Sequence, residues 1–115
     1  MTIQVKKTYR DLNPEMLYDE VRDLVQKQGI IVSESKVQTY SLLSGATQSR
    51  VTLVLKTQGE RPEDQKVCGS GHIIGSPEGE TKMLLDIDEK LILPQEVSAL
   101  QENLDFILGS YEVKW

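Results

Sequence analysis

The sequence predicts an α+β domain in which a curved antiparallel sheet packs against a C-terminal helix, in the order β-α-β-β-β-β-α. Three observations support this class. Five segments alternate apolar and polar residues or are rich in β-branched residues, two segments repeat an apolar residue every three or four positions, and glycine or proline separates most of them. The chain has 115 residues, which fits one domain over residues 1–115 with a core that needs neither disulfides nor metal.

The first two elements are a strand and a helix. Residues 2–9 alternate, so their apolar side chains share one face, which predicts a strand near an edge of the sheet. Asn13 followed by Pro14 is typical of a helix start, because Asn caps unpaired N–H groups and Pro suits the first helical position. Gly29 is typical of a helix end, so the helix is expected to run to about residue 28.

Four further segments are predicted as strands: residues 30–43, 50–57, 66–74 and 81–91. The first of them loses its alternation near residues 33–36, which indicates a bulge or a bend. The charged stretch 58–65 contains Gly59 and Pro62 and is predicted as a solvated loop. Residues 75–79 have the composition of a turn, so the last two strands should form a hairpin.

The last helix is predicted over residues 93–108, and we expect it to cover the sheet. Its apolar stripe consists of Val97, Leu100, Leu104, Ile107 and Leu108. Pro94 suits the first helical position, Leu93 is a poor N-cap, and Gly109 suits a left-handed residue at the end. Residues 110–115 alternate and are compatible with either a short strand or a further helical turn.

Composition restricts the class of protein. Apolar residues make up 38% of the chain and charged residues 27%, which is typical of a globular domain. No apolar run approaches the roughly 20 residues of a membrane span, and residues 1–10 do not resemble a signal peptide, so we expect a cytoplasmic protein without a membrane partner. The net charge of −5 repels phosphate backbones, so nucleic acid is not an expected partner. The single cysteine, Cys68, cannot form an internal disulfide.

Two glycines in the predicted hairpin are unusual in a strand interior. One face should carry Val67, Gly69, Gly71 and Ile73 beside Ile87, Leu85, Met83 and Thr81. Antiparallel pairing with the preceding strand should also bring Leu55 and Leu53 near Gly69 and Gly71. Three interpretations are open: the last helix fills the space with Leu104 or Phe106, a ligand uses it as a cavity floor, or the glycines mark a bulge.

No residue cluster predicts a specific chemistry. Cys68 and His72 should share a strand face about 13 Å apart, which is too far for a nucleophile–base pair or for joint zinc ligation. The Gly-x-Gly between them lacks the further glycine, lysine and helix of a phosphate-binding loop. Asp86 and Asp88 lack the loop geometry of a calcium site. We therefore predict neither a cofactor nor a metal.

The order of elements resembles the fold group that includes the repeat of the TATA-binding protein and the helix-grip proteins of the START and pollen-allergen type. The resemblance covers residues 3–108 and consists in the order of elements. In helix-grip families the sheet curls around the last helix and encloses a hydrophobic cavity. By this resemblance the ligand-binding residues would be Leu53, Leu55, Gly69, Gly71, Met83, Leu85, Leu104 and Leu108.

The sequence alone supports three functional hypotheses. The first is a non-enzymatic domain that binds a small apolar ligand or a protein partner between the sheet and the last helix. The second is a structural or interaction homodimer without a ligand, formed through an edge strand or through a C-terminal tail that ends in Trp115. The third and weakest is a small enzyme that uses Cys68 or His72, because neither has a converging catalytic partner in the sequence.

Overall fold

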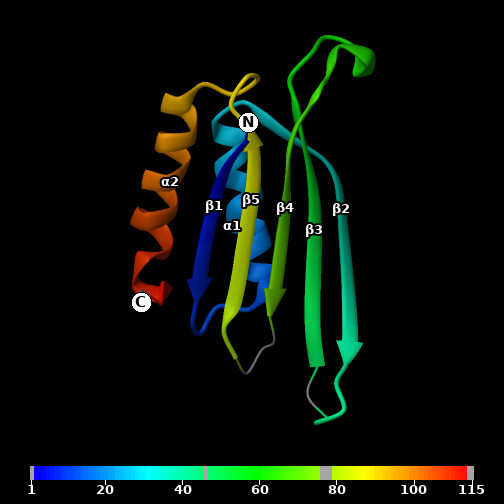
Figure 1. Ribbon diagram of the computed structural model, residues 1–115, viewed down its shortest axis with the longest axis vertical. Helices are drawn as coiled ribbons and strands as arrows, with labels where there is room; N and C mark the ends of the chain where they lie inside the picture. Colours follow the sequence, from blue (N-terminus) through cyan, green and yellow to red (C-terminus); the bar gives the residue numbers. More distant parts are fainter. Residues whose placement is uncertain (1, 46, 76–78, 114–115) are drawn as a thin grey trace.

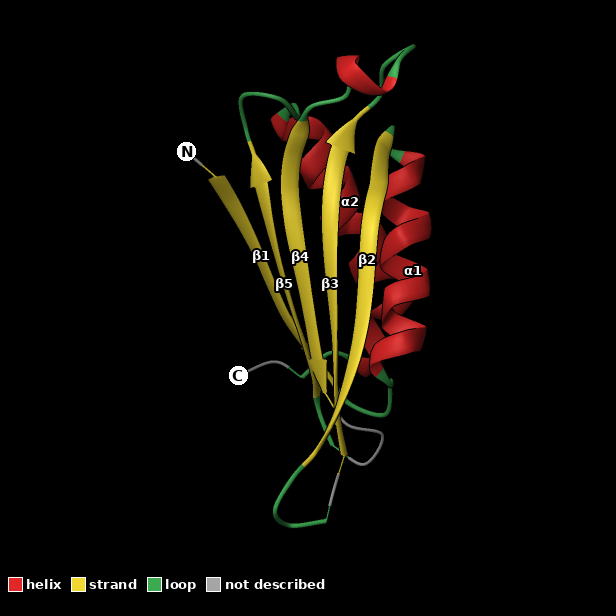
Figure 2. Cartoon of the chain, turned by 90° about the vertical axis from the view of Figure 1, so that its right-hand side faces the viewer, coloured by secondary structure: helices red, strands yellow, loops and turns green. Residues whose placement is uncertain are grey.

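The computed structural model describes residues 2–45, 47–75 and 79–113. The elements are β1 (Thr2–Tyr9), α1 (Pro14–Lys27), β2 (Ile30–Ser41), β3 (Thr47–Thr57), β4 (Val67–Gly75), β5 (Thr81–Asp88) and α2 (Pro94–Leu108). Short 3-10 helices occupy Pro62–Asp64 and Gly109–Tyr111. The five strands form one antiparallel sheet, and both helices lie on the same side of it (Figures 1 and 2). The predicted α+β class and order of elements are confirmed.

The strand order β1-β5-β4-β3-β2 places the first two strands at opposite edges of the sheet. The helix α1 connects these edges and crosses behind the sheet, where it approaches β2, β3 and β4 (Figure 1). The helix α2 lies beside β1 instead (Figure 1). The last helix packs on the sheet, as predicted, and contributes Val97, Leu100, Leu104 and Leu108 to the core. It does not lie over the glycine-containing strand β4, because α1 occupies that position.

The start of α1 follows from local chemistry. The Asn13 side chain accepts a hydrogen bond from the Met16 N–H at 2.9 Å, and Glu15 lies in the first turn, where the helix dipole favours a negative charge. Gly29 has a φ of +78°, which lets the chain reverse from α1 into β2 within two residues.

Two strand boundaries differ from the prediction by three residues, and the others by two residues or fewer. The strand β3 begins at Thr47, three residues before the predicted start, because it pairs with the end of β2 in a long hairpin. The strand β5 ends at Asp88, three residues before the predicted end. The Asp88 carbonyl accepts a hydrogen bond from the Leu91 N–H at 3.1 Å, and the Asp88 carboxylate accepts one from the Lys90 N–H at 2.9 Å. Asp88 therefore closes a turn.

Two register shifts interrupt the sheet. The first lies between Val32 and Glu34, within the predicted bulge. The second lies opposite Leu55 and Lys56 and leaves Cys68 as the extra residue of β4. Cys68 is consequently only 1% exposed and belongs to the core, although simple alternation placed it elsewhere.

One hydrophobic core fills the space between the sheet and the helices. The strands contribute Val5, Tyr9, Val51, Leu53, Leu55, Ile73, Met83, Leu85 and Ile87 to it. The helices contribute Leu17, Val21, Leu24, Val25, Val97, Leu100, Leu104 and Leu108. Ile107, which was predicted in the stripe of α2, is instead 39% exposed.

The register around the two glycines refines the sequence prediction. Leu53 and Leu55 pair with Gly71 and Gly69, as predicted. Across the hairpin, Gly71 pairs with Leu85, two residues from the expected partner. Val67 precedes the bulge and is 58% exposed, so it does not share the glycine face.

The space at Gly71 is filled by neighbouring strands. A Cβ atom there would lie 2.8 Å from Leu85 Cδ2 and 3.1 Å from Leu53 Cδ1. Phe106, one of the two candidates for filling this space, is 91% exposed and therefore does not do so. The leucines on both sides of Gly71 explain why a residue without a side chain is needed in this strand interior.

The end of α2 differs from the predicted cap. Gly109 has a φ of −59°, so it is right-handed and continues into a 3-10 turn. The next residues pair with β1: the Arg10 N–H donates to the Tyr111 carbonyl and the Val113 N–H donates to the Thr8 carbonyl, both at 2.7 Å. The tail thus combines a helical turn with a short bridge. The expected role of Trp115 lies outside the described residues.

No helix in the described part of the chain has the length and apolar character needed to cross a membrane.

Candidate functional site

The sheet face that points away from the helices is open (Figure 2). Strand register places the side chains of this face in rows that run across the strands. One row consists of Thr8, Lys82, Ile74 and Arg50, and the adjacent row consists of Lys6, Leu84, His72, Thr52 and Lys36. We call Lys6, Arg50, His72 and Lys82 the basic quartet.

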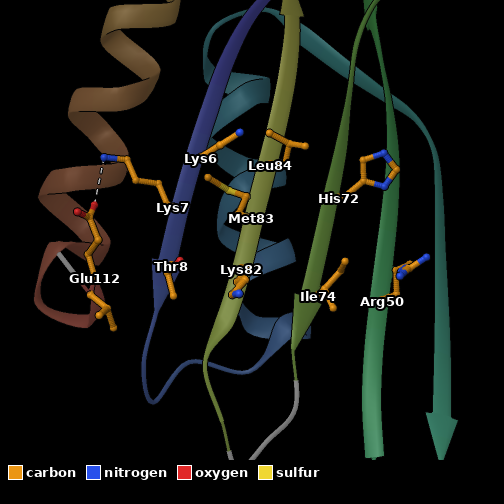
Figure 3. Close-up of a pocket in the computed structure, with 11 residues that line it drawn as sticks. Lys6, Lys7, Thr8, Arg50, His72, Ile74, Lys82, Met83, Leu84 and Glu112 are labelled. Carbon is orange, nitrogen blue, oxygen red and sulfur yellow. Dashed lines mark ion pairs between the residues drawn. The ribbon is translucent and has the colours of Figure 1, made fainter. Parts of the chain in front are cut away.

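The quartet surrounds two apolar side chains (Figure 3). Ile74 lies between Lys82 and Arg50 in its row, and Leu84 lies between Lys6 and His72 in the next. Two strand intervals of about 4.8 Å separate the basic residues of each row by about 10 Å, and the rows are about 7 Å apart. Four nitrogen-bearing side chains therefore lie around an apolar floor.

Two hollows mark this face. The first has a volume of about 620 Å³ and is lined by Lys6, Lys7, Thr8, Arg50, His72, Ile74, Lys82, Met83, Leu84, Glu112 and Val113 (Figure 3). The second has a volume of about 720 Å³ and is lined by Ser33, Glu34, Ser35, Lys36, Thr52, Leu53, Val54, Ser70 and His72. His72 borders both hollows, so they adjoin in the middle of the sheet.

The cations of the quartet are free to meet a ligand. Lys6, Arg50 and Lys82 are exposed, and none forms an ion pair with a described residue. Lys7, the next residue after Lys6, points to the other side and lies 3.1 Å from both the Asp105 and Glu112 carboxylates. Neighbouring lysines of β1 thus have opposite environments.

The opposite end of the open face is acidic. The row beyond Lys6 and His72 contains Gln4, Asp86, Ser70, Val54 and Glu34, and Asp88 follows along β5. The open face therefore changes from positive to negative along β5, while Lys56 adds one cation at the acidic end on β3.

Beside this face, β1 and the C-terminal tail enclose a polar cluster. Burial alone would lower the pKa of Lys7, but its hydrogen bonds and charge interactions with Asp105 and Glu112 raise the pKa above its usual value. The Tyr9 hydroxyl is buried without a hydrogen-bond partner among the described residues. Burial, reinforced by the negative charges of Glu112 and Asp105, raises the pKa of Tyr9 far above its usual range. The cluster joins β1, α2 and the tail.

The residues predicted to bind a ligand lie in the interior, although Met83 also lines the first hollow and Leu53 the second. Six of them belong to the core: Leu53, Leu55, Met83, Leu85, Leu104 and Leu108. Gly71 is buried and Gly69 is half-buried in β4 between β3 and β5. The structure thus brings the set together, but an interior ligand near Gly71 would have to displace the leucines that fill that space.

The prediction that Cys68 and His72 share a strand face is wrong. Cys68 lies in the core, where burial raises the pKa of its thiol, whereas His72 borders the hollows of the open face. The bulge in β4 is the physical reason, because the extra residue reverses the alternation between them. Within the described residues, no three His, Cys, Asp or Glu side chains come close enough to hold a metal ion.

Sequence reasoning missed the basic quartet because its members come from four strands and lie far apart in the chain. The signal was present in the alternation, since Lys6, His72 and Lys82 each occupy the positions opposite to the apolar set of their strand. Pairing those polar sets in the observed strand order brings them together.

No protein-family model, curated protein or solved structure matches this chain.

Proposed function

We propose that this protein is a non-enzymatic binding domain whose open sheet face binds a small molecule with both an anionic group and an apolar body. The observation that carries the proposal is the quartet of basic side chains around Leu84 and Ile74.

The anionic group is inferred from charge. Lys6, Arg50 and Lys82 remain without ion-pair partners among the described residues, although the chain as a whole carries a net charge of −5. Carboxylate or phosphate oxygens would gain charge-assisted hydrogen bonds from these groups. An acidic chain that gathers free cations on one surface attracts anions to that surface.

The apolar body is inferred from the floor of the site. Leu84 and Ile74 are only half-buried, and a ligand that covers them would remove apolar surface from water. The first hollow, at about 620 Å³, has the volume of typical small-molecule sites. A purely ionic ligand would leave this floor exposed.

Titration of the intact protein with decanoate, decyl phosphate, decanol and acetate tests the proposal. Decanoate and decyl phosphate should bind with a measurable Kd by calorimetry, while decanol and acetate should each bind at least about tenfold more weakly. Amide chemical shifts should change in β1, β3, β4 and β5 around the quartet.

Matched variants locate the site. Lys82→Glu and Leu84→Ser should each weaken decanoate binding by about tenfold or more. Lys27→Glu makes the same charge reversal on α1 and should leave binding unchanged. Equal affinity in Lys82→Glu and Lys27→Glu, or shift changes confined to core residues such as Leu104, would refute the proposal.

A second candidate function rests on the opposite charges at the two ends of the open face. A two-fold axis across the strands would place Lys82 of one copy against Asp86 or Asp88 on β5 of another. Light scattering distinguishes this homodimer from the ligand-binding domain, because it predicts twice the monomer mass and dissociation in the Lys82→Glu variant.

A further inference from the structure

A groove follows the surface between α1 and the end of α2, on the side of the molecule away from the open face. One hollow of about 400 Å³ is lined by Leu12, Met16, Asp19, Glu20, Ile107, Leu108 and Tyr111. Another of about 390 Å³ is lined by Glu20, Asp23, Leu24, Gln26, Lys27 and Ile107. Glu20 and Ile107 line both hollows, so we call the two together the interhelical groove.

The length of the groove suits a helical occupant. Met16, Glu20, Asp23 and Lys27 are spaced by four, three and four residues, so they form one line along α1. At 1.5 Å per residue this line is about 16 Å long, the length of about three helical turns. An amphipathic helix that lies in a groove between helices makes contacts at the same spacing.

The first hollow of the groove has an apolar surface. Met16 is 55% exposed, Tyr111 is 40% exposed and Ile107 is 39% exposed, and all three line the first hollow. Scattered exposed apolar residues are ordinary, but these three converge from α1, α2 and the following turn over buried Leu12 and Leu108. A partner that covers them would bury apolar area.

The rim of the groove is acidic. Three carboxylates line the groove, at Asp19, Glu20 and Asp23, against one lining cation, at Lys27. The two helices together carry seven carboxylates against two cations. Arg22 is occupied by Asp19 at 3.7 Å and by Asp23 at 3.8 Å. Glu20 forms no ion pair with a described residue. A complementary partner must therefore be positively charged.

We infer that the interhelical groove binds an amphipathic helix of another protein, with apolar residues at helical spacing and lysine or arginine beside them. This inference goes beyond the proposed function, because it concerns different residues on the opposite side of the molecule.

A second copy of this chain does not meet the same requirement. Its own helices are acidic, so they would be repelled by the rim of the groove. Its basic quartet lies on a sheet that is five strands wide, which does not fit between two helices. An anionic membrane surface would likewise be repelled.

The inference is tested on the intact protein with a fluorescein-labelled peptide of about 15 leucine and lysine residues, arranged so that leucine recurs at helical spacing. The control is a peptide of the same composition in scrambled order. Fluorescence anisotropy should show saturable binding of the first peptide, with affinity at least about tenfold higher than that of the scrambled peptide. Equal affinity for the two peptides would overturn the inference.

Two neighbouring substitutions separate docking in the groove from attraction to an acidic surface. Ile107→Asp and Phe106→Asp each add one negative charge to α2, but Ile107 lines the groove whereas Phe106 is 91% exposed and lines neither of its hollows. Ile107→Asp should weaken peptide binding by about tenfold or more, and Phe106→Asp should leave it unchanged or slightly stronger. Stronger binding in both variants would overturn the inference.

Further measurements keep these results interpretable. Thermal unfolding verifies that both variants are folded. If Ile107→Asp does not fold, Met16→Asp provides a second groove variant. Glu20→Lys should also weaken binding, because it reverses a rim charge. Lys82→Glu should leave peptide binding intact, so failure of the open-face proposal would be seen separately. A wild-type dimer that becomes monomeric in Ile107→Asp would overturn the inference in favour of self-association.

Discussion

The same five strands build two unlike surfaces, and adjacent leucines of β5 show the difference. Leu85 is fully buried against Gly71 of β4, whereas Leu84 is half-buried between Lys6 and His72 on the open face. Alternation along a strand therefore separates two tasks. One set of side chains holds the fold together, and the other set remains available for binding.

The two sides also differ in charge. The helices on one side carry a large excess of carboxylates, while the end of the open face near Lys82 and Arg50 carries cations. The net charge of −5 conceals this division, because it averages over both sides. The comparison between the two surfaces can be tested by pairs of substitutions, one on each side.

The largest expected change in the free energy of unfolding follows substitution of a buried leucine in β5. Leu85→Ala should lower the free energy of unfolding by about 2–5 kcal/mol, because it leaves a cavity in the core. Leu84→Ala removes the same atoms from the open face and should cost less than about 1 kcal/mol. Urea unfolding of both variants measures the difference. Equal losses would contradict the assignment of separate tasks to the two sides.

The second effect concerns the glycines of β4. A Cβ atom at residue 69 would collide with the backbone carbonyl oxygen of Asp86, so Gly69→Ala should cost about 2–3 kcal/mol. Gly71→Ala should cost less, since the ends of Leu85 and Leu53 can move. Ser70→Ala, on the open face between them, should change stability by less than about 0.5 kcal/mol. Thermal unfolding of the three variants checks this order.

The third effect should be a gain in stability. Tyr9→Phe removes a buried hydroxyl that has no partner among the described residues, so the free energy of unfolding should rise by about 1 kcal/mol. The control is Tyr40→Phe. The Tyr40 hydroxyl is exposed and donates to Gln38 at 2.7 Å, and its loss should have little effect. A marked loss of stability in Tyr9→Phe would indicate that the hydroxyl is hydrogen-bonded in solution.

The smallest effect is a dependence on alkaline pH. The folded-state pKa values of Lys7 and Tyr9 are both raised, so their contribution to stability is present below the unfolded-state pKa values of about 10 and is lost as pH rises through the folded values. Urea unfolding between about pH 8 and 11 should show this decline. Lys7→Met should make the decline shallower. Lys6→Met should leave it unchanged, because Lys6 forms no ion pair with a described residue.

The elements of the fold were largely predictable because each carries a strong local signal. The Asn13 cap, the glycine at residue 29 and the alternation of β1 gave correct boundaries for the first strand and helix. The predicted left-handed cap at Gly109 was wrong, because glycine permits a left-handed conformation without requiring it. Pairing of the following tail with β1 favours a right-handed turn at that residue.

The candidate site was not predicted because it depends on strand order. Neither Lys6 nor Arg50 has a local feature that distinguishes it from an ordinary surface cation. They become a site only when β5 and β4 lie between their strands. Cys68 was assigned to the wrong side because the extra residue in β4 is not visible in the alternation of the sequence.

The irregularities of the outer strands have a consequence for solubility. An open sheet offers unpaired backbone groups along both outer strands, and these groups can recruit strands from other molecules. Here the C-terminal tail covers part of β1 through Thr8 and Arg10, and the register shift after Val32 interrupts β2. These two features disfavour strand addition at part of each edge, which helps the open face keep its half-buried apolar side chains without aggregation.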